Sequence, residues 1–298
     1  MYDIIVIGAG PAGISSAIYA TSRGKNVLLI EKEEIGGTIS KVSTVTHYSG
    51  IIASETGPTF SNRLKEQALA SGVKIIYENV IGVSLSDDIK TVTTHQMTYK
   101  AKKVILANGC TPRKLGIPGE EFLTGKGIGL NAIRDSENYR EKNIYVIGGA
   151  DGAIKEAIYL AKLANKLTII HFEDKLGAIP EFLDQITQLN NVEVLTNSRL
   201  TAVYGKEQVE RLEITNEATQ SVQIIEDSGC GIFVYVGSAP NTHLYEGLTL
   251  INGYICVNEK METSISGVYA AGDICAKQVR QIATAVADGA IAGINASI

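Results

Sequence analysis

The chain has 298 residues, enough for about two domains of ordinary size. Its composition, 45% hydrophobic and 20% charged, is that of a globular protein and excludes a disordered or fibrous chain. With 27 basic and 32 acidic residues the net charge is −5, so we expect no nucleic-acid partner. No stretch has the roughly 18 apolar residues of a spanning helix, and the N-terminus lacks signal-peptide features. We therefore expect a cytoplasmic protein without a membrane partner.

The N-terminal residues predict one βαβ unit. Residues 3–7 form a short β-branched run, as in a strand buried on both faces, and a glycine-rich turn follows from Gly8 to Gly13. The next residues, 14–22, suit a helix. A second strand at 27–30 then ends on Glu31.

The same order of elements recurs in the middle of the chain. We predict its strand, turn, helix and second strand at 144–147, 148–153, 154–164 and 167–170. The spacing from Gly8 to Glu31 equals that from Gly148 to His171. This internal repeat predicts an α/β protein with two Rossmann-like, three-layer nucleotide-binding domains.

The remaining segments are placed around these two repeats. Alternating stretches at 73–77, 89–94 and 97–105 predict a small antiparallel sheet covering the first domain. Segments rich in Pro and Gly predict two hinges, at 110–119 and 237–241. Residues 268–298 begin as a buried strand and end as an Ala-rich helix. We expect them to complete the first domain, so that the second is inserted in it.

The first turn has the glycine spacing of a dinucleotide site. Gly8, Gly10 and Gly13 let a pyrophosphate approach the free N–H groups at a helix N-terminus. Glu31 can accept hydrogen bonds from ribose hydroxyls. Near the other end of the chain, an apolar strand leads to Gly272-Asp273, whose carboxylate can accept a ribityl hydroxyl.

Together these motifs resemble the FAD-binding pattern of the pyridine nucleotide–disulfide oxidoreductases, and more closely the low-molecular-weight thioredoxin reductases. The likeness spans essentially the whole chain, through the segments 8–13, 36–38, 112–119, 237–242, 280–281 and 288–290 in that family's order. The resemblance implies a homodimer. It also implies an FAD-binding domain at 1–112 and 243–298, and an NADPH-binding domain inserted at 113–242.

By the same resemblance, FAD is the expected cofactor. Its contacts would come from Gly8, Gly10, Pro11, Ala12, Gly13, Glu31, Lys32, Gly37, Thr38, His47, Asn108, Gly109, Gly272, Asp273, Arg280, Gln281 and Ile282. Three of these depart mildly from the family pattern, because Thr38 replaces Gln, His47 replaces Asn and Asn108 replaces Thr. The flavin site is otherwise intact.

The inserted domain departs more strongly from the family. Its turn carries Ala150 where the pattern has a glycine, and a Cβ there would crowd a pyrophosphate. After the second strand the family carries arginines that bind the 2′-phosphate of NADPH. Here Phe172, Glu173 and Gly177 occupy that segment, so NADPH is expected to be a poor ligand. NADH is not excluded by charge, because Glu173 could accept a ribose hydroxyl.

The catalytic cysteine pair of the family is also missing. Its two positions carry Asn131 and Arg134, followed by Asp135, which in relatives assists proton transfer. Without a dithiol the usual relay to thioredoxin cannot operate. Cys275, close to the Gly-Asp motif, is the candidate for a redox role, with Arg280 expected to lower its pKa.

The other cysteines and the histidines give no second catalytic centre. Cys110, at the first hinge, is a weaker alternative to Cys275, and we expect Cys230 and Cys256 to be structural. No pair of histidines or cysteines has metal-ligand spacing, so no metal site is predicted.

Three functions remain open. The first is an FAD-dependent oxidoreductase reduced by ferredoxin or flavodoxin, which passes electrons to a disulfide, a thioredoxin-like protein or another acceptor. The second is an NAD(P)H-dependent flavin reductase of the ferredoxin–NADP reductase type. The third is an FAD-binding redox sensor or partner subunit without turnover.

Overall fold

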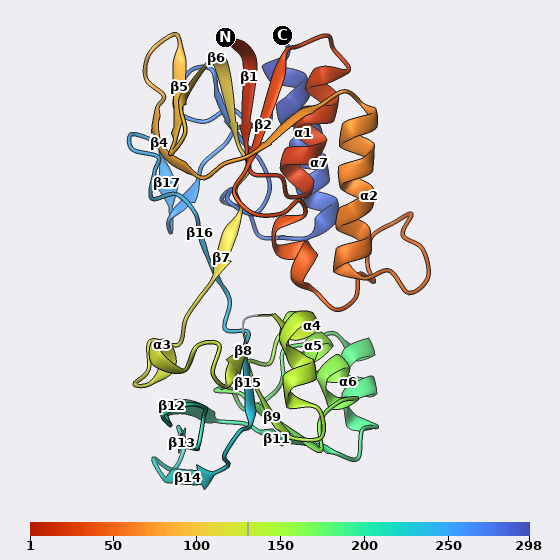
Figure 1. Ribbon diagram of the computed structural model, residues 1–298, viewed down its shortest axis with the longest axis vertical. Helices are drawn as coiled ribbons and strands as arrows, with labels where there is room; N and C mark the ends of the chain where they lie inside the picture. Colours follow the sequence, from red (N-terminus) through yellow and green to blue (C-terminus); the bar gives the residue numbers. More distant parts are fainter. Residues whose placement is uncertain (130) are drawn as a thin grey trace. The chain divides into compact units, whose positions relative to one another are not determined.

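Figure 1 presents the computed structural model, which describes residues 1–129 and 131–298. The chain divides into two compact units: unit 1 is Met1–Thr111 with Ala239–Ile298, and unit 2 is Pro112–Ser238. The sequence placed the domain boundaries after residues 112 and 242. The segments that connect the units, β7 (Cys110–Pro112) and β16 (Ser238–Pro240), lie where the hinges were expected and pair with each other.

Unit 1 is built on a seven-stranded sheet of order β3-β2-β1-β6-β5-β4, with β19 also paired to β6. Its strands are β1 (Tyr2–Ile7), β2 (Val27–Glu31), β3 (Lys74–Tyr77), β4 (Val80–Ser84), β5 (Lys90–Thr94), β6 (Thr98–Leu106) and β19 (Val268–Ala270). β1, β2, β3, β6 and β19 are mutually parallel, whereas β4 and β5 are antiparallel additions. A separate hairpin is formed by β17 (Leu250–Ile251) and β18 (Tyr254–Ile255).

The prediction of a small antiparallel sheet from 73–77, 89–94 and 97–105 is confirmed for the last two stretches, which pair antiparallel as β5 and β6, and is wrong for the first. The first stretch forms β3, which is parallel to β2 in the main sheet. The third forms β6, which pairs with β5 through its polar first half and with β19 through its last residues. The burial of β6 changes along its length, from alternating to continuous over Val104–Leu106. β6 thus pairs antiparallel with β5 and parallel with β19. The alternation of polar and apolar residues in the sequence does not reveal the parallel pairing.

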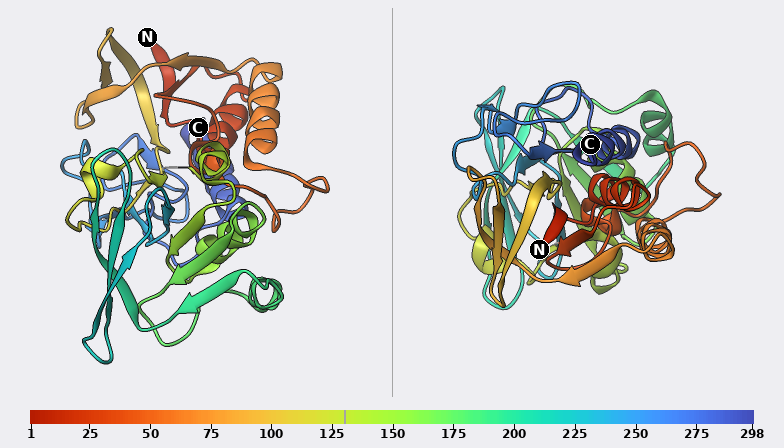
Figure 2. Two further views of the ribbon diagram at one scale, coloured as in Figure 1. Left: turned by 60° about the horizontal axis from the view of Figure 1, so that its bottom comes forward. Right: turned by 90° about the horizontal axis from the view of Figure 1, so that it is seen from above.

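Three helices cover one face of this sheet and lie side by side in Figures 1 and 2. They are α1 (Pro11–Thr21), α2 (Gly57–Ala70) and α7 (Ile282–Ala296), with the short 3-10 helix η1 (Gly37–Lys41) before α2. α7 approaches α1 closely because Gly289 and Gly293 lack side chains. A Cβ at these glycines would lie 2.2 Å from the Ala12 carbonyl oxygen and 2.4 Å from that of Ser16. This packing fixes the N-terminus of α1 against the C-terminal segment.

Unit 2 repeats the architecture with a five-stranded parallel sheet of order β11-β10-β9-β15-β8. Its strands are β8 (Ile128–Gly129), β9 (Asn143–Ile147), β10 (Lys166–Ile170), β11 (Val192–Leu195) and β15 (Gly231–Val234). A three-stranded antiparallel sheet contains β12 (Ser198–Tyr204), β13 (Arg211–Asn216) and β14 (Val222–Glu226). The helices are α3 (Glu120–Leu123), α4 (Ala132–Asp135), η2 (Ser136–Tyr139), α5 (Asp151–Ala161) and α6 (Pro180–Thr187).

In each unit the parallel sheet is buried on both faces, and each face has its own hydrophobic cluster. Helices cover one face, and antiparallel strands and loops cover the other. The predicted α/β class with two Rossmann-like, three-layer units is confirmed.

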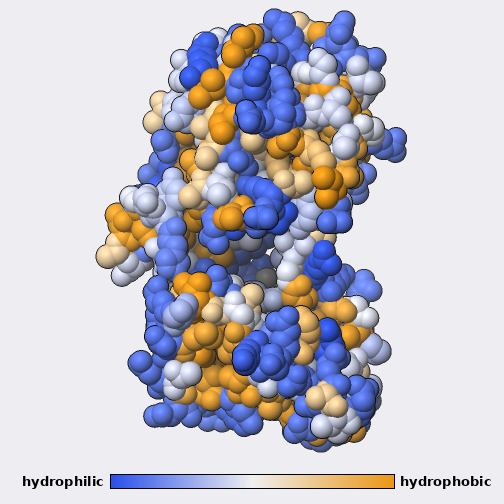
Figure 3. Space-filling view, turned by 180° about the vertical axis from the view of Figure 1, so that it is seen from behind, coloured by the Kyte–Doolittle hydropathy of each residue, from blue (hydrophilic) through white to orange (hydrophobic). Residues whose placement is uncertain are grey.

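No helix within the described residues is long and apolar enough to cross a membrane. On the face drawn in Figure 3, hydrophilic and hydrophobic residues are interspersed over both units.

Candidate functional site

The three glycines of the first turn serve two different purposes. Gly8 has a φ of +97°, and a Cβ on Gly13 would lie 1.8 Å from the Gly8 carbonyl oxygen. Both glycines are therefore required by the fold itself. Gly10 has an ordinary φ of −70°. The atom nearest to a Cβ there is the Gly36 carbonyl oxygen at 3.9 Å. The space beside Gly10 is thus left free for a ligand.

The surroundings of this turn suit the phosphates and ribose of a dinucleotide. The first turn of α1 contains no acidic residue, and no side chain caps it. Its N–H groups and partial positive charge therefore remain available to an anion. Glu31, at the end of β2, is buried. Its carboxylate accepts the N–H groups of Ala9 at 2.8 Å and Glu33 at 3.0 Å, so it is held in one orientation.

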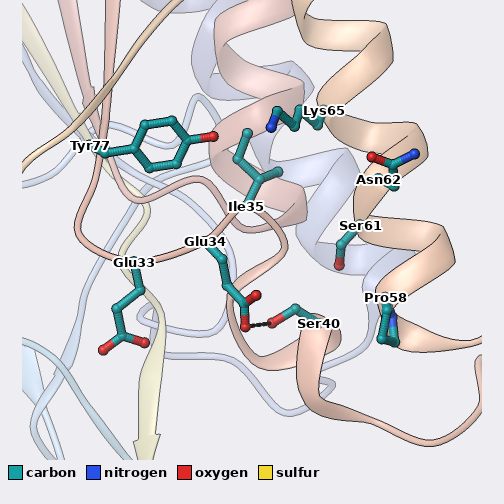
Figure 4. A pocket seen from close by; sticks show the side chains of 9 residues that line it. All are labelled: Glu33, Glu34, Ile35, Ser40, Pro58, Ser61, Asn62, Lys65 and Tyr77. Atoms are coloured by element: carbon teal, nitrogen blue, oxygen red, sulfur yellow. Dashed lines mark hydrogen bonds between the residues drawn. The ribbon is translucent and has the colours of Figure 1, made fainter.

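A pocket of about 430 Å³ opens beside the loop that follows Glu31 (Figure 4). It is lined by Glu33, Glu34, Ile35, Ser40, Pro58, Ser61, Asn62, Lys65 and Tyr77. Figure 4 shows the Lys65 ammonium and the Tyr77 hydroxyl pointing toward each other. The pocket lies at the carboxyl ends of β2 and β3, the edge on which Rossmann folds bind their ligands. It provides room next to the ribose-binding position predicted for Glu31.

Asp273 supplies a carboxylate oxygen that lacks a partner. Its Oδ1 is inaccessible to solvent and has no hydrogen bond within the described residues. Burial raises the pKa of this carboxyl, with Lys277 and Arg280 opposing the shift. A buried acceptor without a donor is costly in an empty site. A ribityl hydroxyl would satisfy it, so the residues present fit FAD.

The structure gathers many of the predicted FAD contacts around the N-terminus of α1. The backbones of these residues lie close together. A Cβ added to Gly8 would lie 2.6 Å from Asn108, one added to Gly272 would lie 2.8 Å from Ala12, and one added to Gly37 would lie 3.6 Å from Gly10. Pro11, Ala12 and Gly13 open α1, while Ile282 opens α7 after its capping residue Gln281. Lys32 and Thr38 are exposed.

Other predicted contacts have partners of their own. The Asn108 amide donates to the Asn241 carbonyl at 3.0 Å, and its Oδ1 accepts the Tyr245 hydroxyl at 2.7 Å. Gly109 follows with a φ of +56°. His47 lies in an exposed loop, with its Nδ1 3.0 Å from the hydroxyl of the preceding Thr46. Sequence reasoning missed Tyr245, because no motif signals a tyrosine that reaches a strand end from a distant loop.

The turn of unit 2 has the same backbone as that of unit 1. Gly148 N–H donates to the Ile170 carbonyl at 3.0 Å, as Gly8 N–H does to Ile30 at 2.8 Å. Ala150 occupies the place of Gly10, with φ −86° and ψ 175° against −70° and −180°. An alanine adopts this conformation without strain. Its exposed methyl therefore lies where a pyrophosphate would approach the helix.

The segment after β10 offers carboxylate and aromatic groups instead of a phosphate site. His171 is buried, and its ring lies against Gly149, where a Cβ would be 2.6 Å from the ring. The Glu173 carboxylate is 3.3 Å from His171 Nε2. Phe172 is exposed beneath the guanidinium of Arg199, which is itself paired with Glu217 at 2.8 Å.

The residues at the two expected cysteine positions form a helix cap and an ion pair. Asn131 Oδ1 accepts the Arg134 N–H at 3.2 Å, capping α4. The Arg134 side chain donates to both carboxylate oxygens of Asp135, at 2.6 and 3.1 Å. The guanidinium thus contacts the Asp135 carboxylate through two parallel N–H groups. Residues 131–135 therefore contain no dithiol, whereas Asp135 is retained.

None of the four cysteines forms a disulfide in the part of the chain that the structure describes. Cys275 is only 2% exposed, and burial raises the pKa of its thiol to about 12. Arg280 does lower this pKa, as expected, but desolvation by burial outweighs the effect of the guanidinium, so the net shift is upward. Burial likewise raises the pKa of Cys230 to about 12. Cys110 is half-buried and donates its S–H to the Asp273 carbonyl at 3.2 Å.

We expect iodoacetamide at pH 8 to leave Cys275 and Cys230 unlabelled in the folded protein. The reason is that the thiolate is the reactive form, and burial keeps both thiols protonated and covered. The half-buried Cys110 and Cys256 should be labelled first. Mass spectrometry of peptides before and after unfolding measures the order. Fast labelling of native Cys275 would restore it as a redox candidate.

No group of three or more His, Cys, Asp or Glu side chains that could hold a metal ion occurs in the described ranges.

Comparison with known proteins agrees with this geometry. The pyridine nucleotide-disulphide oxidoreductase family matches residues 2–289. The chain belongs to this family. It is 37% identical to a thioredoxin reductase of Peptoclostridium acidaminophilum, over 99% of this chain and 96% of that protein.

Solved structures give the same relationship. Thioredoxin reductase from Lactococcus lactis is 33% identical, with a TM-score of 0.95 over 99% of this chain and 98% of its own. A ferredoxin-flavin thioredoxin reductase from Clostridium acetobutylicum is 32% identical, with a TM-score of 0.54 over 99% and 96%. Family membership makes the protein an FAD-dependent oxidoreductase of the thioredoxin reductase-like type.

Proposed function

We propose that the FAD of this oxidoreductase is reduced by an electron-carrier protein, ferredoxin or flavodoxin, and not by NADPH. The observation that carries the proposal is the contrast between the turns of the two units, which have the same backbone conformation but different side chains. The turn at Gly10 is open to a ligand and followed by the fixed carboxylate of Glu31. The turn at Ala150 bears a methyl group and is followed by Phe172 and Glu173.

The charge at unit 2 works against NADPH. Glu173 and Asp174 follow His171 where the family carries arginines for the 2′-phosphate. Carboxylates at this position repel a phosphate dianion and cannot donate hydrogen bonds to it. A carrier protein avoids this problem, because electron transfer needs only close approach to the flavin and no nucleotide site. A solved relative with 32% identity is itself called a ferredoxin-flavin thioredoxin reductase.

In the proposed enzyme, the cofactor contacts follow from the geometry of unit 1. Glu31 would bind the adenosine ribose, the N-terminus of α1 the pyrophosphate, and Asp273 a ribityl hydroxyl. Bound FAD supplies a centre that accepts electrons singly or in pairs. We propose a cytoplasmic homodimer. Its acceptor is a disulfide, that of a thioredoxin-like protein included, or another oxidant that meets the flavin directly, because Asn131 and Arg134 leave no dithiol relay.

NADH reduction is the competing function, and one observation favours it. The unit 2 turn keeps a hydrogen bond that the unit 1 turn also has: Gly177 N–H donates to the Gly149 carbonyl at 2.9 Å, as Gly36 N–H does to the Ala9 carbonyl at 2.9 Å. A ribose with a free 2′-hydroxyl could donate to Glu173 where a phosphate would be repelled. Against it stands the Ala150 methyl, which NADH and NADPH meet equally.

Anaerobic titration of the holoprotein separates these functions. NADPH, NADH and reduced ferredoxin are added to separate samples while the flavin absorbance at about 450 nm is followed. Loss of the absorbance with ferredoxin alone is the expected result. Rapid loss with either nicotinamide would make the protein a reductase of the ferredoxin–NADP type. An unreduced flavin with every donor would favour a sensor or partner subunit.

A double substitution tests the electrostatic argument without any redox reaction. We expect Phe172→Arg with Glu173→Arg to raise the affinity for 2′,5′-ADP by about tenfold or more, through new bidentate contacts to the phosphate. Affinity for 5′-AMP, which lacks the 2′-phosphate, should change little. Isothermal titration calorimetry measures both. An equal gain for the two ligands would show that general charge, and not phosphate recognition, had changed.

A further inference from the structure

The segment that presents Asp273 is tied down on the side away from its free carboxylate oxygen. The carbonyl oxygen of Asp273 accepts two hydrogen bonds, from Cys110 Sγ at 3.2 Å and from Arg280 Nε at 3.3 Å. Arg280 also donates through Nη2 to the Cys275 carbonyl at 3.3 Å. One guanidinium thus holds two carbonyls of the loop that carries Asp273.

Tyr254, which no motif singled out, holds that guanidinium in place. The Arg280 guanidinium carbon lies 4.0 Å from the centre of the Tyr254 ring. This is the closest such contact in the described part of the chain. A guanidinium over an aromatic face is stabilised electrostatically, and the planar ring also restricts its orientation.

The strand that carries Tyr254 is joined to the same loop through its backbone. Ile255 N–H donates to the Ile274 carbonyl at 3.0 Å, and Ala276 N–H donates to the Ile255 carbonyl at 2.8 Å. β18 therefore fixes residues 274–276 directly and Arg280 through the ring of Tyr254. On the other side of the loop, Asp288 accepts Gly272 N–H at 3.1 Å and Lys277 Nζ at 2.6 Å.

We propose that Tyr254 is a positioning residue for FAD, acting through Arg280 to hold the Asp273 carboxylate where the ribityl chain is bound. The inference rests on the proposed FAD contact of Asp273. Arg280 donates through Nε and Nη2 to backbone carbonyls of the loop, and these two bonds tie its guanidinium to the segment that carries Asp273. The ring is what Tyr254 contributes, because its hydroxyl makes no hydrogen bond within the described residues.

Binding of FAD to the apoprotein tests this role. We expect Tyr254→Leu to raise the dissociation constant for FAD about tenfold, since the cation–π contact is lost and Asp273 gains freedom. Tyr254→Phe keeps the ring and should stay within about twofold of the wild type. Arg280→Lys keeps the charge but not the planar pair of donors, and should behave like Tyr254→Leu.

A matched control is the Tyr19–Arg23 contact on α1, a cation–π pair at 5.7 Å outside the Asp273 loop. Tyr19→Leu should leave FAD affinity unchanged. Hydrogen exchange of the amides of residues 273–276 in the apoprotein gives a second readout, and should speed up in Tyr254→Leu but not in Tyr254→Phe. If Tyr254→Leu lowers the thermal midpoint of the apoprotein, its effect on FAD binding could come from general destabilisation. In that case the affinity of Arg280→Lys and the hydrogen-exchange rates of residues 273–276 are the measurements that test the proposal.

Two results would overturn the proposal: an unchanged dissociation constant in Tyr254→Leu, or an equal loss in Tyr254→Phe. A wild-type apoprotein that does not bind FAD would overturn it together with the FAD site. Normal FAD binding without reduction by ferredoxin would leave this inference standing and defeat only the proposed electron donor.

Discussion

Replacing Gly13 with alanine is expected to expel FAD and to destabilise unit 1 by about 3 kcal/mol or more. The added Cβ would lie 1.8 Å from the Gly8 carbonyl oxygen, a backbone atom that cannot move without displacing the turn. In the proposed FAD site this turn presents the N-terminus of α1 to the pyrophosphate, so binding and folding should fail together. Flavin content after purification and urea unfolding of the apoprotein measure the two effects.

Two further glycine variants separate folding from binding. Gly152→Ala, in the second turn, has open space around its Cβ and should be neutral or slightly stabilising. Gly10→Ala also fits the backbone, so the apoprotein should stay stable. Its methyl group should weaken the binding of FAD, just as the Ala150 methyl is proposed to weaken the binding of a nucleotide in unit 2. Wild-type flavin content and stability in Gly13→Ala would contradict this account of the turn.

Replacing Asp273 with asparagine is expected to move affinity and stability in opposite directions. FAD affinity should fall about tenfold to a hundredfold, because the acceptor of the hydrogen bond becomes a neutral amide oxygen in place of a charged carboxylate oxygen. The apoprotein should gain about 1 kcal/mol at pH 7, because the buried side chain no longer carries a negative charge. Calorimetry with FAD and thermal unfolding without it measure the pair of changes.

The pH dependence of the apoprotein follows from the same carboxyl. Its pKa is raised by burial, so the folded state holds a proton that the unfolded state releases between the ordinary and the raised pKa. Stability should therefore fall as pH rises through that window and recover as pH is lowered. Asp273→Asn should remove this dependence. An unchanged pH profile, or a less stable variant at pH 7, would show that Asp273 is already satisfied.

The sequence by itself determined the two Rossmann-like units and their turns. The residues that define a βαβ turn lie close together in the chain, and their backbone needs can be read from glycine and proline alone. Gly8 and Gly13 are required by contacts within the turn and its neighbouring strand end, and Pro11 opens the helix. The loss of the cysteine pair at Asn131 and Arg134 is likewise visible without a structure.

Only the tertiary structure decided which side chains are available for chemistry. The burial of Cys275 depends on segments that precede it in the chain, among them Ile255 of β18 and Leu106 of β6. This burial reverses the pKa shift expected from its neighbour Arg280. The two pairings of β6 depend on which strands meet its two halves. The contact of Tyr254 with Arg280 also depends on the tertiary structure, because Tyr254 belongs to the separate hairpin of β17 and β18. Short-range spacing specifies backbone geometry, whereas burial and partners come from segments that folding brings together.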